Sequence, residues 1–253
     1  MLVAERHEKI VDTVNDRGSI RVSELSQIFK VTEETIRRDL EKLEKDGKLQ
    51  RSHGGAVSIK DNNEAEAPYF EREITNVNEK KEVAAEAIKY VSINDRIILD
   101  ASTTAWYMAK SLPDISLTVL TNSIKVAVEL ANREKVKVIA VGGAMLQKSL
   151  SFVGPQTTNA LEYYHVNKAF ISCHGIHAER GISDSNEMQA LVKKKMFAIS
   201  DQIYVLADHT KFGMQAFSRI ASLDSIDHII TDSKTSNEQI RPFQDLSIKI
   251  IRP

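Results

Sequence analysis

The chain has 253 residues, and its 34 Lys and Arg against 35 Asp and Glu give a formal net charge of −1. Hydrophobic residues make up 42% of the chain and charged residues 27%, which excludes a disordered or collagen-like protein. The near-neutral balance also excludes a uniformly basic nucleic-acid binder, so any affinity for DNA must come from a local face.

A single cysteine, Cys173, excludes an intramolecular disulfide. The sequence contains no apolar run of about 18 residues, the length that a membrane span needs. Its first ten residues are rich in charge, where a secretory signal would need an apolar stretch. We therefore expect a cytoplasmic protein with no membrane partner, built as one large domain or two unequal ones.

The first sixty residues begin with the pattern of two short helices. In the first, over residues 4–15, apolar residues recur at helical spacing: Ile10, Val11 and Val14. Gly18 marks its end. Ser23 then stands where the N-cap of a second helix, running to Phe29, is expected.

A third helix and a hairpin follow. Thr32 is the predicted N-cap of this helix and Gly47 its stop, and its buried stripe recurs at i, i+4 and i+7 as Ile36, Leu40 and Leu43. Two short extended runs, 49–51 and 56–59, then flank His53-Gly54-Gly55, and such a glycine pair indicates a hairpin. Three helices followed by a small hairpin predict a winged helix-turn-helix, which is mostly α.

In a winged helix-turn-helix the third helix enters the major groove of DNA. That helix offers Thr35, Arg37 and Arg38 away from its apolar stripe, and arginine can pair with guanine or bind phosphate. The hairpin adds Arg51 and His53. A solvated charged helix in a three-helix interaction module, with no DNA partner, is the alternative that the pattern alone leaves open.

Residues 20–57 closely resemble the N-terminal DNA-binding segment of the DeoR family of bacterial transcriptional regulators. The family signature, V-[ST]-x-x-T-[IV]-R-R-D-L followed by a G-G-A wing, is intact as Val31–Leu40 and Gly54–Ala56. The resemblance implies binding to double-stranded operator DNA through the third helix and the wing. The candidate DNA-contacting residues are Ser23, Thr32, Thr35, Arg37, Arg38, Arg51, His53 and Gly54.

A polar stretch without apolar periodicity, ending in a proline, covers residues 60–68 and indicates a boundary. We therefore divide the chain into a DNA-binding domain, a linker and a larger domain, at 1–60, 61–76 and 77–253. The end of that linker, 69–76, has apolar residues that could pack against the larger domain.

The larger domain alternates short apolar runs with helical stretches of about ten residues. The runs are 96–100, 117–120, 136–141, 168–172, 202–207 and, less clearly, 226–231. This alternation predicts an α/β domain with a largely parallel sheet covered by helices.

Polar residues directly follow four of these runs: Ser102-Thr103-Thr104, Asn122-Ser123, Gly142-Gly143 and Asp208 to Lys211. Ligands of open parallel sheets bind outside the carboxyl ends of the strands. The first group would also open a helix, where free N–H groups and hydroxyls suit a phosphate, and Lys211 could add positive charge. Each group alone is typical of N-caps and turns, but four on one rim favour a site for a small anion.

This second half resembles the sensor domain of the DeoR family, which is similar in fold to ribose-5-phosphate isomerase and glucosamine-6-phosphate deaminase. Family members commonly sense phosphorylated sugars. The resemblance implies that Ser102, Thr103 and Thr104 hold the phosphate, while other rim residues line the sugar. The candidate effector-binding residues are Asp100, Ser102, Thr103, Thr104, Asn122, Ser123, Gly142, Gly143, Lys193, Asp208 and Lys211.

Two departures from the family pattern bear on chemistry. Gln189 stands where many members carry a glutamate, and residues 174–179 lack the Gly-Ala-Asp-type pattern that carries the catalytic aspartates of the related isomerases. Proton transfer between sugar carbons needs a positioned base, for which Glu179 and Glu187 remain. We therefore expect that the protein is not an enzyme and binds no cofactor. The group Cys173, His174 and His177 lacks further ligands at metal-binding spacing, so we expect no metal either.

The predicted function is therefore repression of a carbohydrate-utilisation operon, relieved by a phosphorylated sugar. One winged helix touches few base pairs, so we expect a homo-oligomer, either a dimer or a tetramer. A transcriptional activator of the same architecture is one alternative. The other is a sugar-phosphate isomerase or deaminase with a regulatory DNA-binding head.

Overall fold

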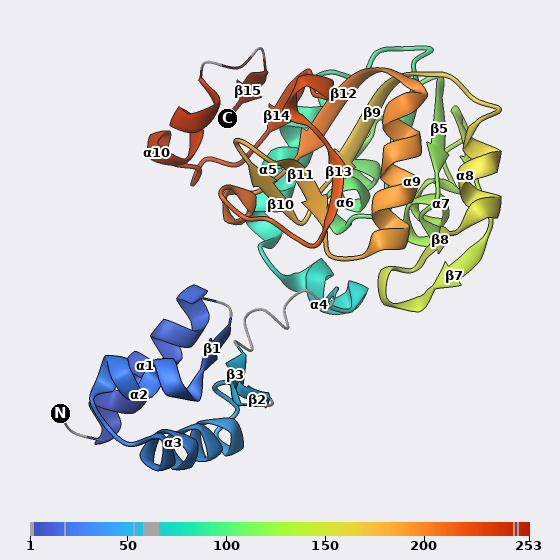
Figure 1. The fold of residues 1–253 in the computed structure, drawn as a ribbon. Coiled ribbons are helices and arrows are strands. Elements are labelled where there is room, and N and C mark those ends of the chain that lie inside the picture. The colour runs from blue at the N-terminus through green and yellow to red at the C-terminus, as the bar shows by residue number, and fades with distance from the viewer. Residues whose placement is uncertain (1–2, 18, 53, 58–65, 245, 247) are drawn as a thin grey trace. The chain divides into compact units, whose positions relative to one another are not determined.

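The computed structural model describes residues 3–17, 19–52, 54–57, 66–244, 246 and 248–253 (Figure 1). The chain forms two compact units, Met1–Ala65 and Glu66–Pro253. The predicted linker, 61–76, thus reaches into the second unit, where helix α4 spans Tyr69–Ile74.

The described residues of the first unit form three helices and a small sheet. Their bounds are α1 Val3–Arg17, β1 Ser19–Arg21, α2 Val22–Phe29, α3 Glu33–Lys45, β2 Gln50–Ser52 and β3 Gly55–Val57. The apolar stripes of the three helices meet in one core, in which Ile10, Leu25 and Ile36 are fully buried. The predicted winged helix-turn-helix is confirmed.

One capping prediction for this unit is wrong. Helix α2 begins at Val22, so Ser23 lies in its first turn, and extended Arg21 takes the N-cap position without a side-chain hydrogen bond. The cause is strand β1, which pairs with β3 and runs directly into α2. At three residues, β1 is too short for strand alternation to show in the sequence.

Thr32, in contrast, is the N-cap of α3 as predicted. Its hydroxyl accepts a hydrogen bond from the backbone N–H of Thr35 at 3.3 Å. Lys30, with a φ of 53°, turns the chain from α2 into this cap. The short α2–α3 connection fixes where the exposed face of α3 begins.

The second unit is built on seven parallel strands in the order β15-β14-β12-β9-β4-β5-β6. Their bounds are β4 Arg96–Leu99, β5 Leu117–Thr121, β6 Val136–Ala140, β9 Val166–Ser172, β12 Ser200–Leu206, β14 His228–Ile230 and β15 Lys249–Ile251. The predicted α/β class is confirmed, and β15 is a strand that the sequence did not indicate.

Helices and short 3-10 turns connect these strands. The helices after α4 are α5 Val77–Ile88, α6 Thr103–Ser111, α7 Ile124–Leu130, α8 Pro155–Leu161, α9 Glu187–Ala198 and α10 Asn237–Ile240. The 3-10 turns are η2 Gln147–Ser149, η3 His209–Lys211, η4 Leu223–Ser225 and η5 Arg241–Phe243. Within the described residues, no helix is both long and apolar enough to span a membrane.

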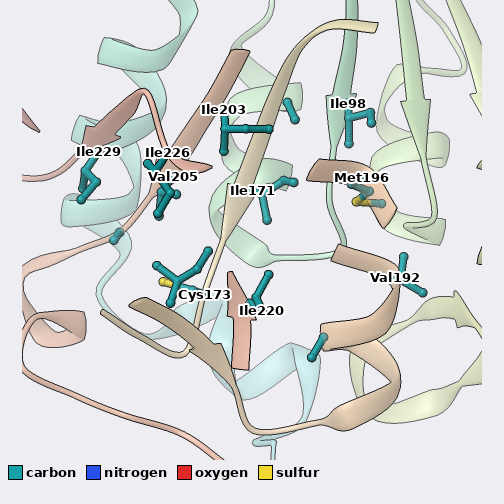
Figure 2. Close-up of a cluster of buried hydrophobic side chains, with 14 of the residues drawn as sticks. Ile98, Ile171, Cys173, Val192, Met196, Ile203, Val205, Ile220, Ile226 and Ile229 are labelled. Atoms are coloured by element: carbon teal, nitrogen blue, oxygen red, sulfur yellow. The ribbon is translucent and has the colours of Figure 1, made fainter. Parts of the chain in front are cut away.

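Strand alternation sends buried side chains to two separate cores. Ile97 and Leu99 of β4 pack with α5, α6 and α7 on one face of the sheet. Ile98 points to the other face, where Figure 2 shows it in one cluster with Val192 and Met196 of α9. Both faces are thereby covered, as a parallel sheet requires.

Five further short strands lie outside the parallel sheet. β7 Ala144–Leu146 and β8 Ser151–Val153 form an antiparallel hairpin. β10 Gly175–His177, β11 Gly181–Asp184 and β13 Ser218–Ala221 form a second antiparallel sheet. The sequence predicted neither, because strands of three or four residues carry too little alternation.

The order of the parallel strands creates a switch point between β4 and β9. From β4 the chain continues to β5 and β6 on one side, and later returns to β9 on the other. In such sheets the crevice at the carboxyl ends of the two strands is the usual ligand site. We call the carboxyl ends of the parallel strands the rim.

Candidate functional site

Helix α3 presents its two adjacent arginines to solvent. Arg37 donates to Glu33 at 2.7 Å, and Arg38 lies 3.4 Å from Glu34. Their side chains are 54% and 78% exposed, so these i,i+4 ion pairs contribute little and are easily exchanged for another anion. Both guanidinium groups are therefore available to phosphate or to base edges.

Asp39, the next residue of the family signature, has a different role that the sequence did not reveal. It is buried and accepts from Arg6 at 2.7 and 3.1 Å and from His7 at 2.9 Å. Burial alone would raise the pKa of Asp39, but the bonds from Arg6 and His7 outweigh it and hold the pKa below its usual value. Asp39 follows Ile36 by three residues, and this position on the apolar stripe was the available signal.

The wing hairpin is positioned by backbone contacts. Its strands pair Arg51 with Ala56, and the N–H of Arg51 donates to Glu44 of α3 at 2.8 Å. Gly54 has a φ of +88°, which favours glycine, and its carbonyl accepts from the N–H of Val22 at 2.9 Å. The candidate residue His53 lies outside the described residues, while Arg51 is exposed.

In the second unit, Asp100 organises the switch point. One carboxylate oxygen accepts from the N–H and the hydroxyl of Ser102, at 3.2 and 2.6 Å. The other accepts from the N–H of Ser172 at 3.2 Å, which joins the ends of β4 and β9. Asp100 is fully buried, so it shapes the site from behind.

The N-terminus of α6 opens directly after this carboxylate. Ser102 is its N-cap and accepts from the N–H of Ala105 at 3.0 Å. Among the described residues, the backbone N–H groups and hydroxyls of Thr103 and Thr104 have no hydrogen-bond partner. Free donors at a helix N-terminus suit an anion.

Lys193 lies at the same switch point, but its ammonium already has partners within the fold. Its ammonium donates to Asp184 at 2.6 Å and to the carbonyl of Ser172 at 2.8 Å, and lies 3.3 Å from Asp100. Burial alone would lower its pKa, but the two carboxylates outweigh burial and raise it. Lys193 therefore holds β9, β11 and the Asp100 loop together, with three acceptors for its three N–H groups.

The next two strand ends are tied to the β7–β8 hairpin and α8. Asn122 donates to the carbonyl of Phe152 at 2.9 Å, while its own buried Oδ1 accepts no hydrogen bond from the described residues. Ser123 caps α7, so its hydroxyl is used within the fold. Gly142 accepts from Thr157 at 2.9 Å.

Gly143, next to it, is required by close packing. Its φ is +156°, and a Cβ there would stand 2.1 Å from the Thr157 hydroxyl. Any larger residue would therefore push α8 away from the rim. Among the described residues, these contacts leave the side-chain Oδ1 of Asn122 as an unsatisfied acceptor at this end of the site.

The end of β12 contributes one carboxylate and one free ammonium. Asp208 is buried and accepts from the N–H of Thr210 at 3.0 Å, which caps η3. Lys211 is half-buried, and its ammonium forms no ion pair or hydrogen bond with the residues that the structure describes. A half-buried cation in this place could bind a ligand, and the effector-binding role of Lys211 stays a prediction.

Three charged residues near the rim were missed because they lie in or next to the predicted linker. Glu66 is paired with Arg72 of α4, and Lys80 of α5 donates to the carbonyls of Arg72 and Thr75. Burial lowers the pKa of Lys80 to about 8. Their ordinary polar context in the sequence carried no signal for this arrangement.

Gln189, the departure from the family pattern, is buried and bonded to two serine hydroxyls. Its amide nitrogen donates to the hydroxyls of Ser149 and Ser151, both at 2.7 Å. The two possible bases, Glu179 and Glu187, are exposed. Cys173 is buried, which raises its pKa to about 12, and no group of three or more metal-ligating side chains is found in the described ranges.

Comparison with known families matches both units. Residues 6–62 match the DeoR-like helix-turn-helix domain, and residues 75–233 match the DeoR C terminal sensor domain. The two matches together cover most of the chain.

Curated relatives match over nearly the full length. The chain is 61% identical over 250 residues to the uncharacterized HTH-type transcriptional regulator YulB of Bacillus subtilis, covering 99% of this chain and 96% of that protein. It is 35% identical to the L-fucose operon activator of Escherichia coli, over 91% of this chain and 96% of that one. It is also 35% identical to the HTH-type transcriptional repressor GlcR of Bacillus subtilis, over 92% and 89%.

Among solved structures, ribose 5-phosphate isomerase A of Methanocaldococcus jannaschii is similar to part of the chain. The TM-score is 0.41 with 17% identity, over 54% of this chain and 55% of that one. A similarity at this level carries no statement about activity.

Proposed function

Because the chain belongs to the DeoR family of transcriptional regulators, we propose that it represses a carbohydrate-utilisation operon and is released by a phosphorylated sugar bound at the rim. The observation that carries the effector half is the N-terminus of α6, where Thr103 and Thr104 keep free donors beside the switch point. Related proteins named for a sugar operon, such as the L-fucose operon activator, support the class of target.

The DNA half rests on α3 and the wing. Thr35, Arg37 and Arg38 would meet base edges and phosphates in the major groove, and Arg51 the adjacent backbone. Binding of effector and of operator are linked, so a sugar phosphate that releases DNA must bind the DNA-free state more tightly.

Repression is the simpler of the two regulatory outcomes. It needs only occupancy of an operator, whereas activation needs an additional contact with the transcription machinery. Some relatives are named activators and others repressors. Whether this protein activates or represses is tested by placing its operator upstream of, or across, a reporter promoter. Catalysis is not part of the proposal: Glu179 and Glu187, the two bases that the sequence suggested, are both exposed.

The effector half is tested by thermal unfolding of the full chain with a panel of phosphorylated sugars. A ligand that binds the folded state raises the melting temperature. We expect the double substitution Thr103→Val with Thr104→Val to remove most of that rise, because it removes two hydroxyl donors and keeps side-chain volume. Thr118→Val, on β5, is the matched control.

Two results would count against the proposal. If no phosphorylated sugar in the panel raises the melting temperature, the effector class is wrong. If the rise survives in the double variant as it does in the control, the phosphate is held elsewhere.

A further inference from the structure

The second unit begins with a buried carboxylate. Glu66 is its first residue, and its side chain is only 10% exposed. One oxygen accepts from the Arg72 guanidinium at 2.8 Å, while Oε2 is buried and has no hydrogen-bond partner among the described residues. A buried carboxylate with half of its acceptors unused is costly, so this position calls for a functional reason.

Several cations act on the charge of Glu66, and Arg72 is in direct contact with it. Its charge interacts favourably with Arg72, Lys193 and Lys148, and unfavourably with Asp184. Burial raises the pKa of Glu66 in spite of these cations. Since Lys193 and Asp184 also hold the loop of Asp100, the carboxylate stands near the rim to which the phosphate is assigned.

Helix α4 ties this carboxylate to the same rim. The Arg72 Nε donates to the carbonyl of Ala67 at 2.9 Å, which closes the segment on itself. Tyr69 is fully buried, and α4 packs against α6, the helix that carries Thr103 and Thr104. The ammonium of Lys80 holds the end of α4 through the carbonyls of Arg72 and Thr75.

We propose that Glu66 is an internal competitor for the effector, whose anionic group displaces the carboxylate and takes over the Arg72 guanidinium. The inference rests on the proposed function, because it assigns the regulation of the same site. Arg72 is thereby an effector-binding residue that the family motifs did not supply. A phosphate would satisfy Arg72 with more acceptor oxygens than the carboxylate offers.

The position of Glu66 in the chain links displacement of its carboxylate to the DNA-binding unit. Glu66 is the residue at which the chain enters the second unit, so its release acts on the covalent connection to the DNA-binding unit. A ligand shifts an equilibrium only by its differential affinity for two states, and displacement of Glu66 supplies the second state. Removing the carboxylate should therefore mimic part of the effector's action.

The test measures binding of inorganic phosphate to the full chain by equilibrium dialysis with radiolabelled phosphate. Loss of an internal competitor raises the apparent affinity by the reciprocal of the fraction of sites that the competitor had left unblocked. We expect Glu66→Gln and Glu66→Ala to bind phosphate about fivefold to tenfold more tightly than the natural chain. Glu71→Gln, which removes the same charge from the exposed side of α4, should bind like the natural chain.

The outcomes separate this inference from the proposed function. If both Glu66 variants bind phosphate no more tightly than Glu71→Gln, or if none of the proteins binds it, the internal competitor is overturned. A panel of phosphorylated sugars that still stabilises the natural chain would then leave the proposed function standing. Tighter phosphate binding by both Glu66 variants alone supports the competitor, whichever sugar proves to be the effector.

Discussion

Asp39 shows how one residue in a DNA-reading motif can serve folding rather than recognition. Asp39 directly follows the two exposed arginines of α3 in the chain, but its side chain lies on the buried side of the helix. There it accepts hydrogen bonds from Arg6 and His7 of α1. Removing one partner of a buried ion pair leaves the other charge uncompensated. The acidic position of the signature therefore joins α1 to α3, and the arginines before it remain free to face DNA.

Asp39→Asn should lower the free energy of unfolding of the first unit by about 2–4 kcal/mol at pH 7, because Arg6 keeps its charge in a buried site. Since the folded pKa of Asp39 is depressed, its stabilisation is present above the ordinary carboxyl pKa of about 4 and is lost as pH falls through the lowered value. Urea unfolding followed by circular dichroism measures both effects. Asp12→Asn, an exposed position on α1, is the control, and equal stability of the two variants would contradict the assignment.

At the scale of elements, helix α4 depends on a buried lysine. The ammonium of Lys80 donates to two carbonyls at the C-terminal end of α4, those of Arg72 and Thr75. A neutral amine still has two hydrogens, so both bonds survive deprotonation. Burial disfavours the charged form of the Lys80 amine, and this lowers its pKa to about 8.

The pH dependence of stability follows from that direction. Between pH 8 and about 10.4 the unfolded chain binds the proton that folded Lys80 has lost, so folding stability should rise with pH in this window. Relative to Lys80→Met, the natural chain should gain about 2 kcal/mol between pH 7.5 and 9.5. Urea unfolding followed by the fluorescence of Trp106, the single tryptophan, measures this in the second unit. Lys81→Met is exposed and should show no such gain; a gain of equal size there would refute the role of Lys80.

The elements differ in how far the sequence could predict them. The stripe of Ile36, Leu40 and Leu43 repeats over three turns, so α3 and its Thr32 cap were predictable. β1 and the two small antiparallel sheets have strands of three or four residues and were not. Rim residues such as Lys211 follow strands and could be placed.

Side-chain partners were harder to predict than positions. Lys193 belonged to the expected effector set, but its three acceptors come from three separate segments of the chain, and no local pattern encodes that. Glu66 was missed for the same reason, since the environment of its carboxylate is made by residues that are distant in sequence.

At the scale of the whole molecule, the near-zero net charge concentrates DNA affinity in a few side chains. The first sixty residues hold 12 basic and 11 acidic residues, so little non-specific attraction is available. Each head offers Arg37, Arg38 and Arg51 as exposed cations. Selective binding then requires several DNA-binding units on one DNA molecule, which is the physical reason to expect an oligomer.

Arg51→Ala should weaken binding to operator and to scrambled DNA by a similar factor, because a wing arginine that contacts DNA phosphates does not read the base sequence. The slope of log affinity against log salt should become shallower by about one for each head bound. Mobility shifts over a series of salt concentrations, with sedimentation to count the heads, measure this. Lys9→Ala on α1 serves as the charge-matched control, and an unchanged slope in Arg51→Ala would remove the wing from the interface.

The buried thiol of Cys173 has a practical consequence for measuring the distance between the two units. The thiol is 5% exposed and burial raises its pKa to about 12, so at neutral pH it is protonated and shielded from solvent. Alkylating labels should therefore not react with it. A cysteine introduced at Lys45 and another at Lys249 would then be the reactive pair in an otherwise natural chain. Spin labels on that pair would report the separation of reading head and sensor directly, before and after a sugar phosphate is added.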